Sequence, residues 1–279
     1  MAIRRWMPVE SFQDWTKFEQ IEVSPRTHGP VPSQGPQETA TIIEEFKKTP
    51  YYLDIFNTYK VLAIYVVGSR SINMHTDTSD LDMIVILDEK RSLFNVRPIA
   101  RLAYKGIPVH YNMYSYEELF HFEDFTKTEK LFVQQLFFGT EPIAVYLSEK
   151  GVKLHKYFVD NRERLLNLGA SLVVKFHANT LKNYAIKPVR AHAISKWLYH
   201  PIMACEILTN TLNIELLSNI KNCTFRAHDK YDMKATIIKP LTIEVNKFNE
   251  VATALDQDKL TKEIDLVTEE IIKLVECEG

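Results

Sequence analysis

The sequence predicts an α+β domain followed by a mainly α-helical domain, and three observations lead to this prediction. Two continuous apolar runs rich in branched residues, 61–67 and 81–87, have the composition of buried strands. Apolar residues recur at spacings of three and four from Thr39 and again from Phe94, which is typical of helices. Beyond Ser115 helical spacing dominates. We therefore expect a mixed sheet with flanking helices, and a helical bundle after it.

Length and composition are those of an ordinary globular protein. The chain has 279 residues, of which 46% are hydrophobic and 25% charged, and a formal net charge of −2. This balance excludes a disordered chain and argues against a strongly basic nucleic-acid binder. The three cysteines form no closely spaced pair, so neither a zinc ribbon nor a disulfide framework is expected. This cysteine usage fits a reducing cytoplasm. The longest apolar run, residues 61–67, is too short to span a membrane, so no membrane association is expected.

Three parts are predicted along the chain. Proline and glycine crowd the end of residues 1–36, which predicts an irregular arm. Residues 37–145 form the predicted α+β domain, and residues 146–279 form the helical domain. The individual elements expected are helices from Thr39 with a break at Pro50, strands over 61–67, 81–87 and 107–114, helices over 94–104, 150–168, 170–185 and 189–212, and a last helix over 241–277 with a break near Asp256.

The residues with chemical potential lie between the first two predicted strands. The first strand ends at Gly68-Ser69, and after a spacer of ten residues the second begins with Asp80-Leu81-Asp82. Residues i and i+2 of a strand share a face, so both carboxylates point the same way. Adjacent carboxylates repel each other unless a cation lies between them, and paired aspartates beside a phosphate suit Mg²⁺. The sequence therefore predicts a magnesium site next to a phosphate site.

The predicted phosphate site consists of three consecutive residues. Glycine is scarce in this chain, with eight residues, and no glycine-rich phosphate loop is present. Gly68 would still let the backbone approach a phosphate closely, because it lacks a Cβ. A helix beginning at Gly68-Ser69 would present free N–H groups, and Arg70 would add positive charge. Phosphate chemistry is thus expected from one glycine, one serine and one arginine.

Taken together, Gly68-Ser69, the spacer and Asp80-Leu81-Asp82 at the start of a strand resemble the signature of the DNA polymerase β-like nucleotidyltransferase superfamily. The resemblance covers roughly residues 37–115. The whole chain also resembles the bacterial and phage-type predicted nucleotidyltransferases. In these proteins the α+β domain that carries the signature, called the palm, precedes a helical domain. Within the predicted helical domain, the segment Lys196–His200 is similar to a Lys/Tyr/His helix of that group.

The resemblance implies a reaction and a set of roles. Asp80 and Asp82 would bind two Mg²⁺ ions, with Mn²⁺ as a substitute, and Gly68 and Ser69 would hold the β- and γ-phosphates of a nucleoside triphosphate such as ATP. An acceptor hydroxyl would attack the α-phosphate, and pyrophosphate would leave. RNA such as a tRNA end, a protein side chain and a small molecule all remain open as acceptor, and the oligomeric state is open too.

The sequence departs from the family pattern at one position. The superfamily supplies a third carboxylate from an adjacent strand, whereas the predicted strand here offers His110 and Asn112, with Glu117 and Glu118 just beyond. Histidine can serve as a base but is a poor Mg²⁺ ligand. His110 is therefore the expected catalytic base, with Asn112 or a nearby glutamate as alternatives. The departure also motivates a second hypothesis, a weak or inactive palm that binds nucleotide or RNA. Analogy at the level of the fold adds a third, a protein-interaction module of the antitoxin-like kind.

A basic stretch supplies two further candidates. Residues 151–200 contain nine lysines and arginines against two acidic residues. Such a run is usually a solvated face, but it would neutralise a triphosphate or follow a nucleic-acid backbone if it faced the palm. Lys182 and Lys196 are the nucleotide-binding candidates in this stretch.

Overall fold

Two compact units make up the chain. The structure, a computed structural model, describes residues 36–71, 79–89, 99–101, 106–120, 142–181, 201, 203–210 and 239–276. One unit, called the sheet unit, consists of Val31–Gly169 and Gln257–Gly279. The second unit consists of Met1–Pro30 and Ala170–Asp256.

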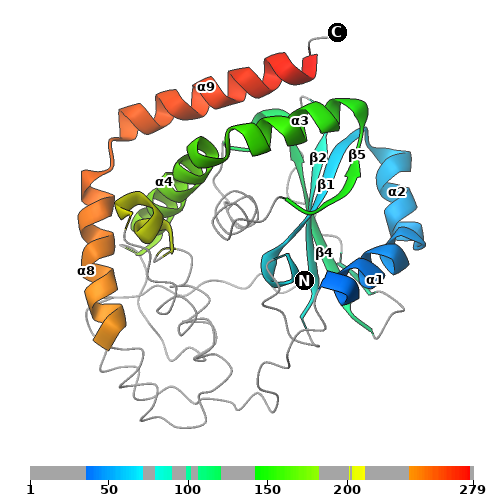
Figure 1. Ribbon diagram of the computed structural model, residues 1–279, viewed down its shortest axis with the longest axis horizontal. Helices are drawn as coiled ribbons and strands as arrows, with labels where there is room; N and C mark the ends of the chain where they lie inside the picture. Colours follow the sequence, from blue (N-terminus) through cyan, green and yellow to red (C-terminus); the bar gives the residue numbers. More distant parts are fainter. Residues whose placement is uncertain are drawn as a thin grey trace. The chain divides into compact units, whose positions relative to one another are not determined.

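The sheet unit contains all five strands described in the chain (Figure 1). Its elements are α1 (Pro36–Lys47), α2 (Pro50–Thr58), β1 (Val61–Val67), the 3-10 turn η2 (Gly68–Arg70), β2 (Leu81–Leu87), β3 (Ile99–Arg101), β4 (Pro108–Ser115), the 3-10 turn η3 (Tyr116–Glu118), β5 (Ala144–Leu147), α3 (Glu149–Asp160) and α9 (Gln257–Glu276). Helix α4 (Arg162–Leu181) continues from this unit into the second, which also contains α8 (Lys239–Ala254).

The sheet is mixed, as predicted, and its strand order is β3-β4-β2-β1-β5. Strand β1 pairs with β2 and with β5 in antiparallel fashion. Strand β2 pairs with β4 in parallel, and β3 closes the far edge in antiparallel pairing with β4. Strands β1 and β2 are buried along their whole length, because they lie in the centre and are covered on both faces. The predicted α+β class is confirmed.

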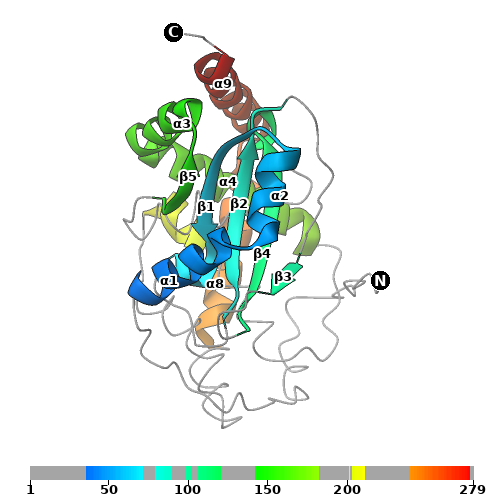
Figure 2. The same ribbon diagram turned by 90° about the vertical axis from the view of Figure 1, so that its right-hand side faces the viewer.

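Helices α1 and α2 cover one face of the sheet (Figures 1 and 2). Proline at the first position of α2 fits a helix start, because its missing N–H has no partner there anyway. Thr49 caps that helix, its hydroxyl accepting from the backbone N–H of Tyr52. The predicted break at Pro50 is thus the start of a second helix.

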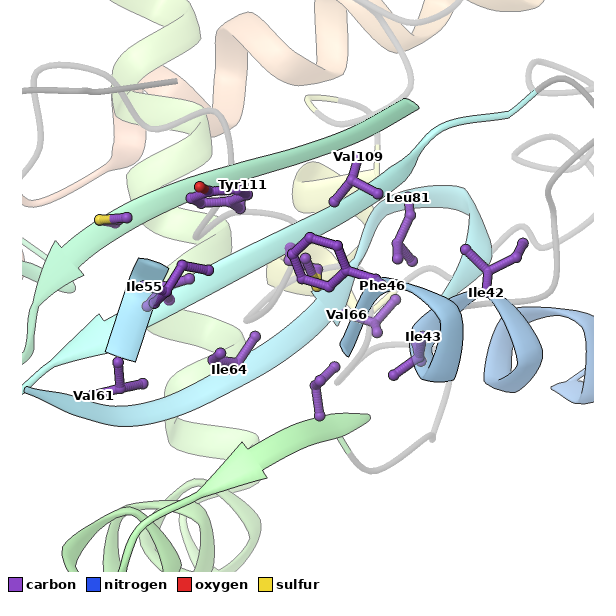
Figure 3. Packing of buried hydrophobic residues seen from close by; sticks show 14 of the residues in the cluster. Ile42, Ile43, Phe46, Ile55, Val61, Ile64, Val66, Leu81, Val109 and Tyr111 are labelled. Atoms are coloured by element: carbon purple, nitrogen blue, oxygen red, sulfur yellow. The ribbon is translucent and has the colours of Figure 1, made fainter. Parts of the chain in front are cut away.

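One apolar core joins these two helices to the sheet (Figure 3). Ile42 and Phe46 of α1 and Ile55 of α2 are almost fully buried and lie over β1, β2 and β4. The strand side chains in this core are Val61, Ile64, Val66, Leu81, Met83, Val85, Leu87, Val109, Tyr111, Met113 and Val145. Apart from Val61, which precedes an irregularity in the pairing of β1, those of β1, β2 and β4 are alternate residues, so the residues between them face the other side of the sheet.

Helix α3 lies on that other side. The ring of Tyr65, fully buried, stacks on His155, with centroids 5.8 Å apart, and lies beside Phe158. The hydroxyl of Ser148 caps α3 by accepting from the N–H of Gly151. Gly151 is required there, because a Cβ would collide with the carbonyl oxygen of Leu62 on β1.

Helix α9 returns to the sheet unit from the end of the chain and runs beside α3 (Figures 1 and 2). Its residues Val267, Ile271 and Val275 are fully buried. The hydroxyl of Tyr116 in η3 donates a hydrogen bond of 3.0 Å to Glu276, the last residue of α9. The predicted break near Asp256 is confirmed as the gap between α8 and α9.

Several predicted elements differ from the structure. Residues 99–101, predicted as helix, form β3, and β5 was not predicted at all. The helix predicted to begin at Gly68 is a turn of three residues. The predicted boundary between helices near residue 169 lies instead at Asn161, which caps the end of α3, while α4 runs on unbroken.

The remaining predictions lie largely outside the described residues. Of the predicted helix over 189–212, residues 203–209 are described and helical. Residues 1–35 lie outside the described part, and the predicted division of the chain at residues 36 and 145 stays a prediction.

The described parts of the second unit are helical. Glu206 is almost fully buried there and pairs with Lys247 of α8 at 3.6 Å, and Cys205 beside it is also buried. No helix in the described ranges of the chain has both the length and the apolar character needed to cross a bilayer.

Candidate active site

Strand pairing brings the predicted residues together at one end of the sheet. Strand β1 ends where β2 begins, so Val67 is paired with Asp82. Parallel pairing places His110 of β4 opposite Asp82 on its other side. Residues far apart in sequence thus become neighbours because three strands meet at one end.

Alternation along the strands directs these side chains away from the α1–α2 core. Leu81 and Met83 of β2, like Val109 and Tyr111 of β4, belong to that core. The residues between them must face the opposite side. Asp82 and His110 therefore lie on the same face of the sheet.

The functional groups of this site converge closely. His110 Nδ1 lies 2.7 Å from Asp80 Oδ2 and 3.8 Å from Asp82 Oδ1. One ligand atom from each of the three residues lies within 4.8 Å of the others. The side chains of Asp80 and His110 are about one-third exposed, whereas that of Asp82 is 12% exposed. Two carboxylates and one imidazole at this spacing form a group able to hold a divalent metal ion.

Gly68 makes room for the buried member of this group. Its φ is +77°, a conformation that side-chain-bearing residues rarely adopt. A Cβ at this position would lie 2.7 Å from Asp82 Oδ2, closer than non-bonded atoms approach. The sequence predicts that glycine is needed here for close approach to a phosphate, and the structure adds that glycine is needed for the Asp82 carboxylate.

Arg70 lies almost fully buried, with 1% of its surface exposed, and holds the segment that carries Asp80. Its Nε and Nη2 donate to the carbonyl oxygen of Ser79 at 3.1 and 2.7 Å. Its Nη1 lies 4.0 Å from the carboxylate of Glu38 on α1. Burial lowers the pKa of the Arg70 guanidinium, against the opposing effect of the charges on Glu38 and Asp80. Arg70 therefore positions the backbone directly before Asp80.

The structure places the candidates for the third position at different distances from the aspartates. His110 lies beside them, and its Nδ1 faces both carboxylates. Asn112 is two residues further along β4, opposite Ile84, and its side-chain nitrogen donates to the Tyr114 hydroxyl at 3.3 Å. Its Oδ1 is buried and has no hydrogen-bond partner among the residues that the structure describes.

The glutamates considered for this role are remote. Glu117 and Glu118 lie in η3, beyond the opposite end of β4. At about 3.3 Å per strand residue, the five positions from His110 to Ser115, the last residue of β4, span about 17 Å. The structure therefore places these two glutamates away from Asp80 and Asp82, and their part in catalysis stays a prediction.

The other predicted site residues divide into two groups. Gly68, Ser69 and Arg70 form η2, beside the start of β2. Lys182 and Lys196 lie outside the described residues. The structure also adds two partners of Arg70 that the sequence did not single out, the carboxylate of Glu38 and the backbone carbonyl of Ser79. Neither belongs to a motif, since Glu38 is on a distant helix and the carbonyl is a backbone group.

Comparison with known proteins agrees with this site through a family match. Residues 51–164 match the family model described as a nucleotidyltransferase domain. The crystal structure of a nucleotidyltransferase-like protein from Exiguobacterium sibiricum is similar at 15% identity and a TM-score of 0.27, covering 86% of this chain and 74% of that one. No curated protein matches the chain. The family match includes Gly68, Asp80, Asp82 and His110.

Proposed function

Because residues 51–164 belong to the nucleotidyltransferase domain family of the DNA polymerase β-like superfamily, we propose that the protein transfers a nucleoside monophosphate to a hydroxyl acceptor. The observation that carries this proposal is the convergence of Asp80, Asp82 and His110 within 4.8 Å at the end of the sheet, inside that domain. A nucleoside triphosphate would be the donor, and RNA such as a tRNA end, a protein or a small molecule would be the acceptor.

The proposed reaction is a single displacement at phosphorus. The acceptor oxygen forms a bond to the α-phosphorus, and the bond from that phosphorus to the bridging oxygen breaks. Pyrophosphate leaves with the electron pair, and the hydroxyl proton passes to a base. Divalent cations, with two Mg²⁺ ions as the family pattern implies and Mn²⁺ as a substitute, would neutralise the charge on the phosphates.

The chain's own residues have distinct parts in this proposal. Asp80 and Asp82 hold the cation, and His110 either accepts the proton or joins them as a ligand. Gly68 and Ser69 hold the β- and γ-phosphates. The nucleotide contacts predicted for Arg70, Lys182 and Lys196 stay predictions. For Arg70, burial and the bonds to Ser79 support a positioning role.

A second candidate function rests on a specific observation. An imidazole occupies the position where the superfamily has a third carboxylate, which would weaken the binding of Mg²⁺. A palm of this kind can bind nucleotide or RNA, or dock a protein partner, without turnover. This candidate predicts nucleotide binding in the absence of label transfer.

One experiment separates the two functions. The protein is incubated with each α-labelled nucleoside triphosphate, Mg²⁺ or Mn²⁺, and RNA, protein or small-molecule acceptors. Asp82→Asn should lower label transfer by roughly 100-fold or more, since it removes a cation ligand. Asp88→Asn is the matched control, because Asp88 follows the other end of β2 and pairs with Lys150 at 3.2 Å.

The outcomes are distinct. Transfer by the wild-type protein and by Asp88→Asn, but not by Asp82→Asn, supports the enzyme. Nucleotide-dependent thermal stabilisation without transfer supports the binding module. If the wild-type protein shows neither effect, both candidates are wrong.

A further inference from the structure

The imidazole of His110 is the feature that sets this site apart from an all-carboxylate metal site. It lies directly opposite Asp82 in the strand register. Its Nδ1 is turned toward both carboxylates, 2.7 Å from one and 3.8 Å from the other. In an octahedral complex with bonds of about 2.1 Å, adjacent donors are about 3 Å apart. The contact of 2.7 Å is a hydrogen-bond distance, and a bound metal ion would replace the proton between the two atoms. The two contacts bracket the spacing of adjacent metal donors, so the nitrogen is placed to serve as a third donor.

We infer that Asp80, Asp82 and His110 bind one divalent first-row transition-metal ion in preference to Mg²⁺, with His110 Nδ1 as a direct ligand. Mg²⁺ takes oxygen ligands and binds through carboxylates and phosphates. Imidazole instead suits transition metals, whose affinity for nitrogen sites rises along the series from Mn²⁺. A neutral imidazole in place of a third carboxylate also removes one negative charge, which disfavours Mg²⁺ further.

The described surroundings offer no carboxylate that would restore a magnesium site. The described His, Cys, Asp and Glu residues that form a group of this kind are Asp80, Asp82 and His110. Glu117 and Glu118 lie at the far end of β4, and Glu38 lies beside Arg70. The donor set in the described part of the chain is therefore two carboxylates and one imidazole.

The site is also built to hold this geometry. Asp82 is 8% exposed as a whole residue, and its carboxylate lies so close to Gly68 that a Cβ there would come within 2.7 Å of Oδ2. The backbone before Asp80 is held by two hydrogen bonds from Arg70. His110 lies in a strand paired on both sides, with Asp82 and with Ile99. Fixed donors select among metals more strongly than mobile ones, because the ion cannot draw in other ligands.

The inference rests on the proposed function only for the role of the metal, so its test measures binding on the full-length protein. Mn²⁺ is the probe, because it is paramagnetic and the transition ion least favoured by nitrogen, which makes the test stringent. Pulsed electron paramagnetic resonance of bound Mn²⁺ should show coupling to a directly bound imidazole ¹⁴N. His110→Asp should abolish that coupling, while Asp88→Asn should keep it.

Competition with Mg²⁺ supplies the second measurement. The wild-type protein should bind Mn²⁺ roughly tenfold or more tightly than Mg²⁺, and His110→Asp should lower this ratio at least roughly fivefold. Circular dichroism confirms that each variant is folded. An unchanged ratio, bound Mn²⁺ without ¹⁴N coupling, or no Mn²⁺ binding at millimolar concentration would overturn the inference.

The two proposals fail in different ways. Coupling to ¹⁴N without any label transfer leaves the metal assignment standing and contradicts the proposed enzyme. The opposite outcome has two parts. Wild-type protein with Mn²⁺ shows no ¹⁴N coupling, and His110→Asp with Mg²⁺ transfers label as efficiently as the wild-type protein does with Mn²⁺. This result supports the enzyme and contradicts the metal assignment.

Discussion

Gly68 shows at the scale of a single residue how the site depends on backbone geometry. It combines a φ of +77° with a close approach to a site residue, because a Cβ added to it would lie 2.7 Å from Asp82 Oδ2. The sequence singles out this glycine because it alone ends a buried strand before the paired aspartates. Its contact with Asp82 emerges only from the antiparallel pairing of β1 and β2.

Replacing Gly68 by alanine should damage the site more than the fold. The new Cβ would displace the Asp82 carboxylate, so we expect Mn²⁺ affinity to fall roughly tenfold or more. The positive φ should also cost about 1–2 kcal/mol of unfolding free energy. Metal titration followed by electron paramagnetic resonance, and urea denaturation, measure the two effects.

Gly106→Ala is the control for this prediction. Gly106 has a φ of +65°, but its Cβ would meet no atom within 4 Å. It should lose a similar amount of stability and keep its metal affinity. Equal loss of metal affinity in both variants would mean that backbone strain, and not the contact with Asp82, explains the effect.

Arg70 shows the limit of residue-scale reasoning. An arginine next to Gly-Ser suggests a phosphate contact, because both features attract anions. The structure turns the guanidinium toward the carbonyl of Ser79 and the carboxylate of Glu38 instead. These partners are a backbone group and a residue 32 positions upstream, so the local sequence contains no sign of them.

At the scale of elements, the strands with uniform apolar composition were predictable. Strands β1 and β2 have the predicted bounds, because buried central strands are continuously apolar. Strands β3 and β5 have three and four residues and lie at the two edges of the sheet. Their formation depends on pairing with a neighbour, which periodicity over so few residues does not indicate.

Helix α9 is attached to its neighbours by a polar network. Arg164 donates to Glu263 at 2.5 Å and to Glu270 at 2.7 Å, and the Tyr157 hydroxyl donates to Glu270 at 2.6 Å. Burial acts to raise the pKa of Glu270, but the hydrogen bonds from Tyr157 and Arg164 outweigh it, so the pKa lies below its ordinary value. Glu270 therefore stabilises the fold in its charged form.

This network should make the stability of the protein depend on pH. Since the folded pKa of Glu270 is lowered, its contribution is present above the unfolded value of 4.5 and is lost as pH falls through the folded pKa. Glu270→Gln should cost about 1 kcal/mol at pH 7, a value reduced by solvent screening. Urea denaturation at pH 7 and below pH 4 should show that the difference in unfolding free energy between the wild-type protein and Glu270→Gln becomes smaller at low pH.

The neighbouring glutamate is the control. Glu269 is exposed and pairs with Lys273 at 3.6 Å within the same helix. Glu269→Gln should change stability by a few tenths of a kcal/mol at either pH. If Glu270→Gln lowers the free energy of unfolding equally at both pH values, the charged form of Glu270 is not what stabilises the fold.

At the scale of the whole molecule, the sheet unit is assembled from two separate stretches of chain. Residues 31–169 supply the sheet and most of its helices, and residues 257–279 return to complete it. Val267, Ile271 and Val275 of α9 are fully buried there. Each such side chain contributes about 1.5–3 kcal/mol by burial. The last helix is therefore an integral part of the sheet unit.

Removal of residues 257–279 should unfold the sheet unit. The buried area lost is equivalent to about 5 kcal/mol or more, comparable with the whole stability of a domain. Circular dichroism and thermal denaturation should show loss of the cooperative transition.

Single substitutions in α9 test the same point more gently. Ile271→Ala should lower the free energy of unfolding by about 2–4 kcal/mol, whereas Leu266→Ala, at a position that is 51% exposed, should lower it by less than about 1 kcal/mol. Similar losses of stability in Ile271→Ala and Leu266→Ala would mean that the buried face of α9 is not what stabilises the sheet unit.

The sequence by itself determined the α+β class and the central strands, and it singled out Gly68, Asp80 and Asp82 as candidate site residues, because these depend on local composition and on spacing within one stretch of chain. Tertiary structure alone decided that His110 completes the group, that Arg70 faces Ser79 and Glu38, and that α9 completes the sheet unit. These features arise from strand register and helix packing, which join residues distant in sequence and are specified by the fold as a whole.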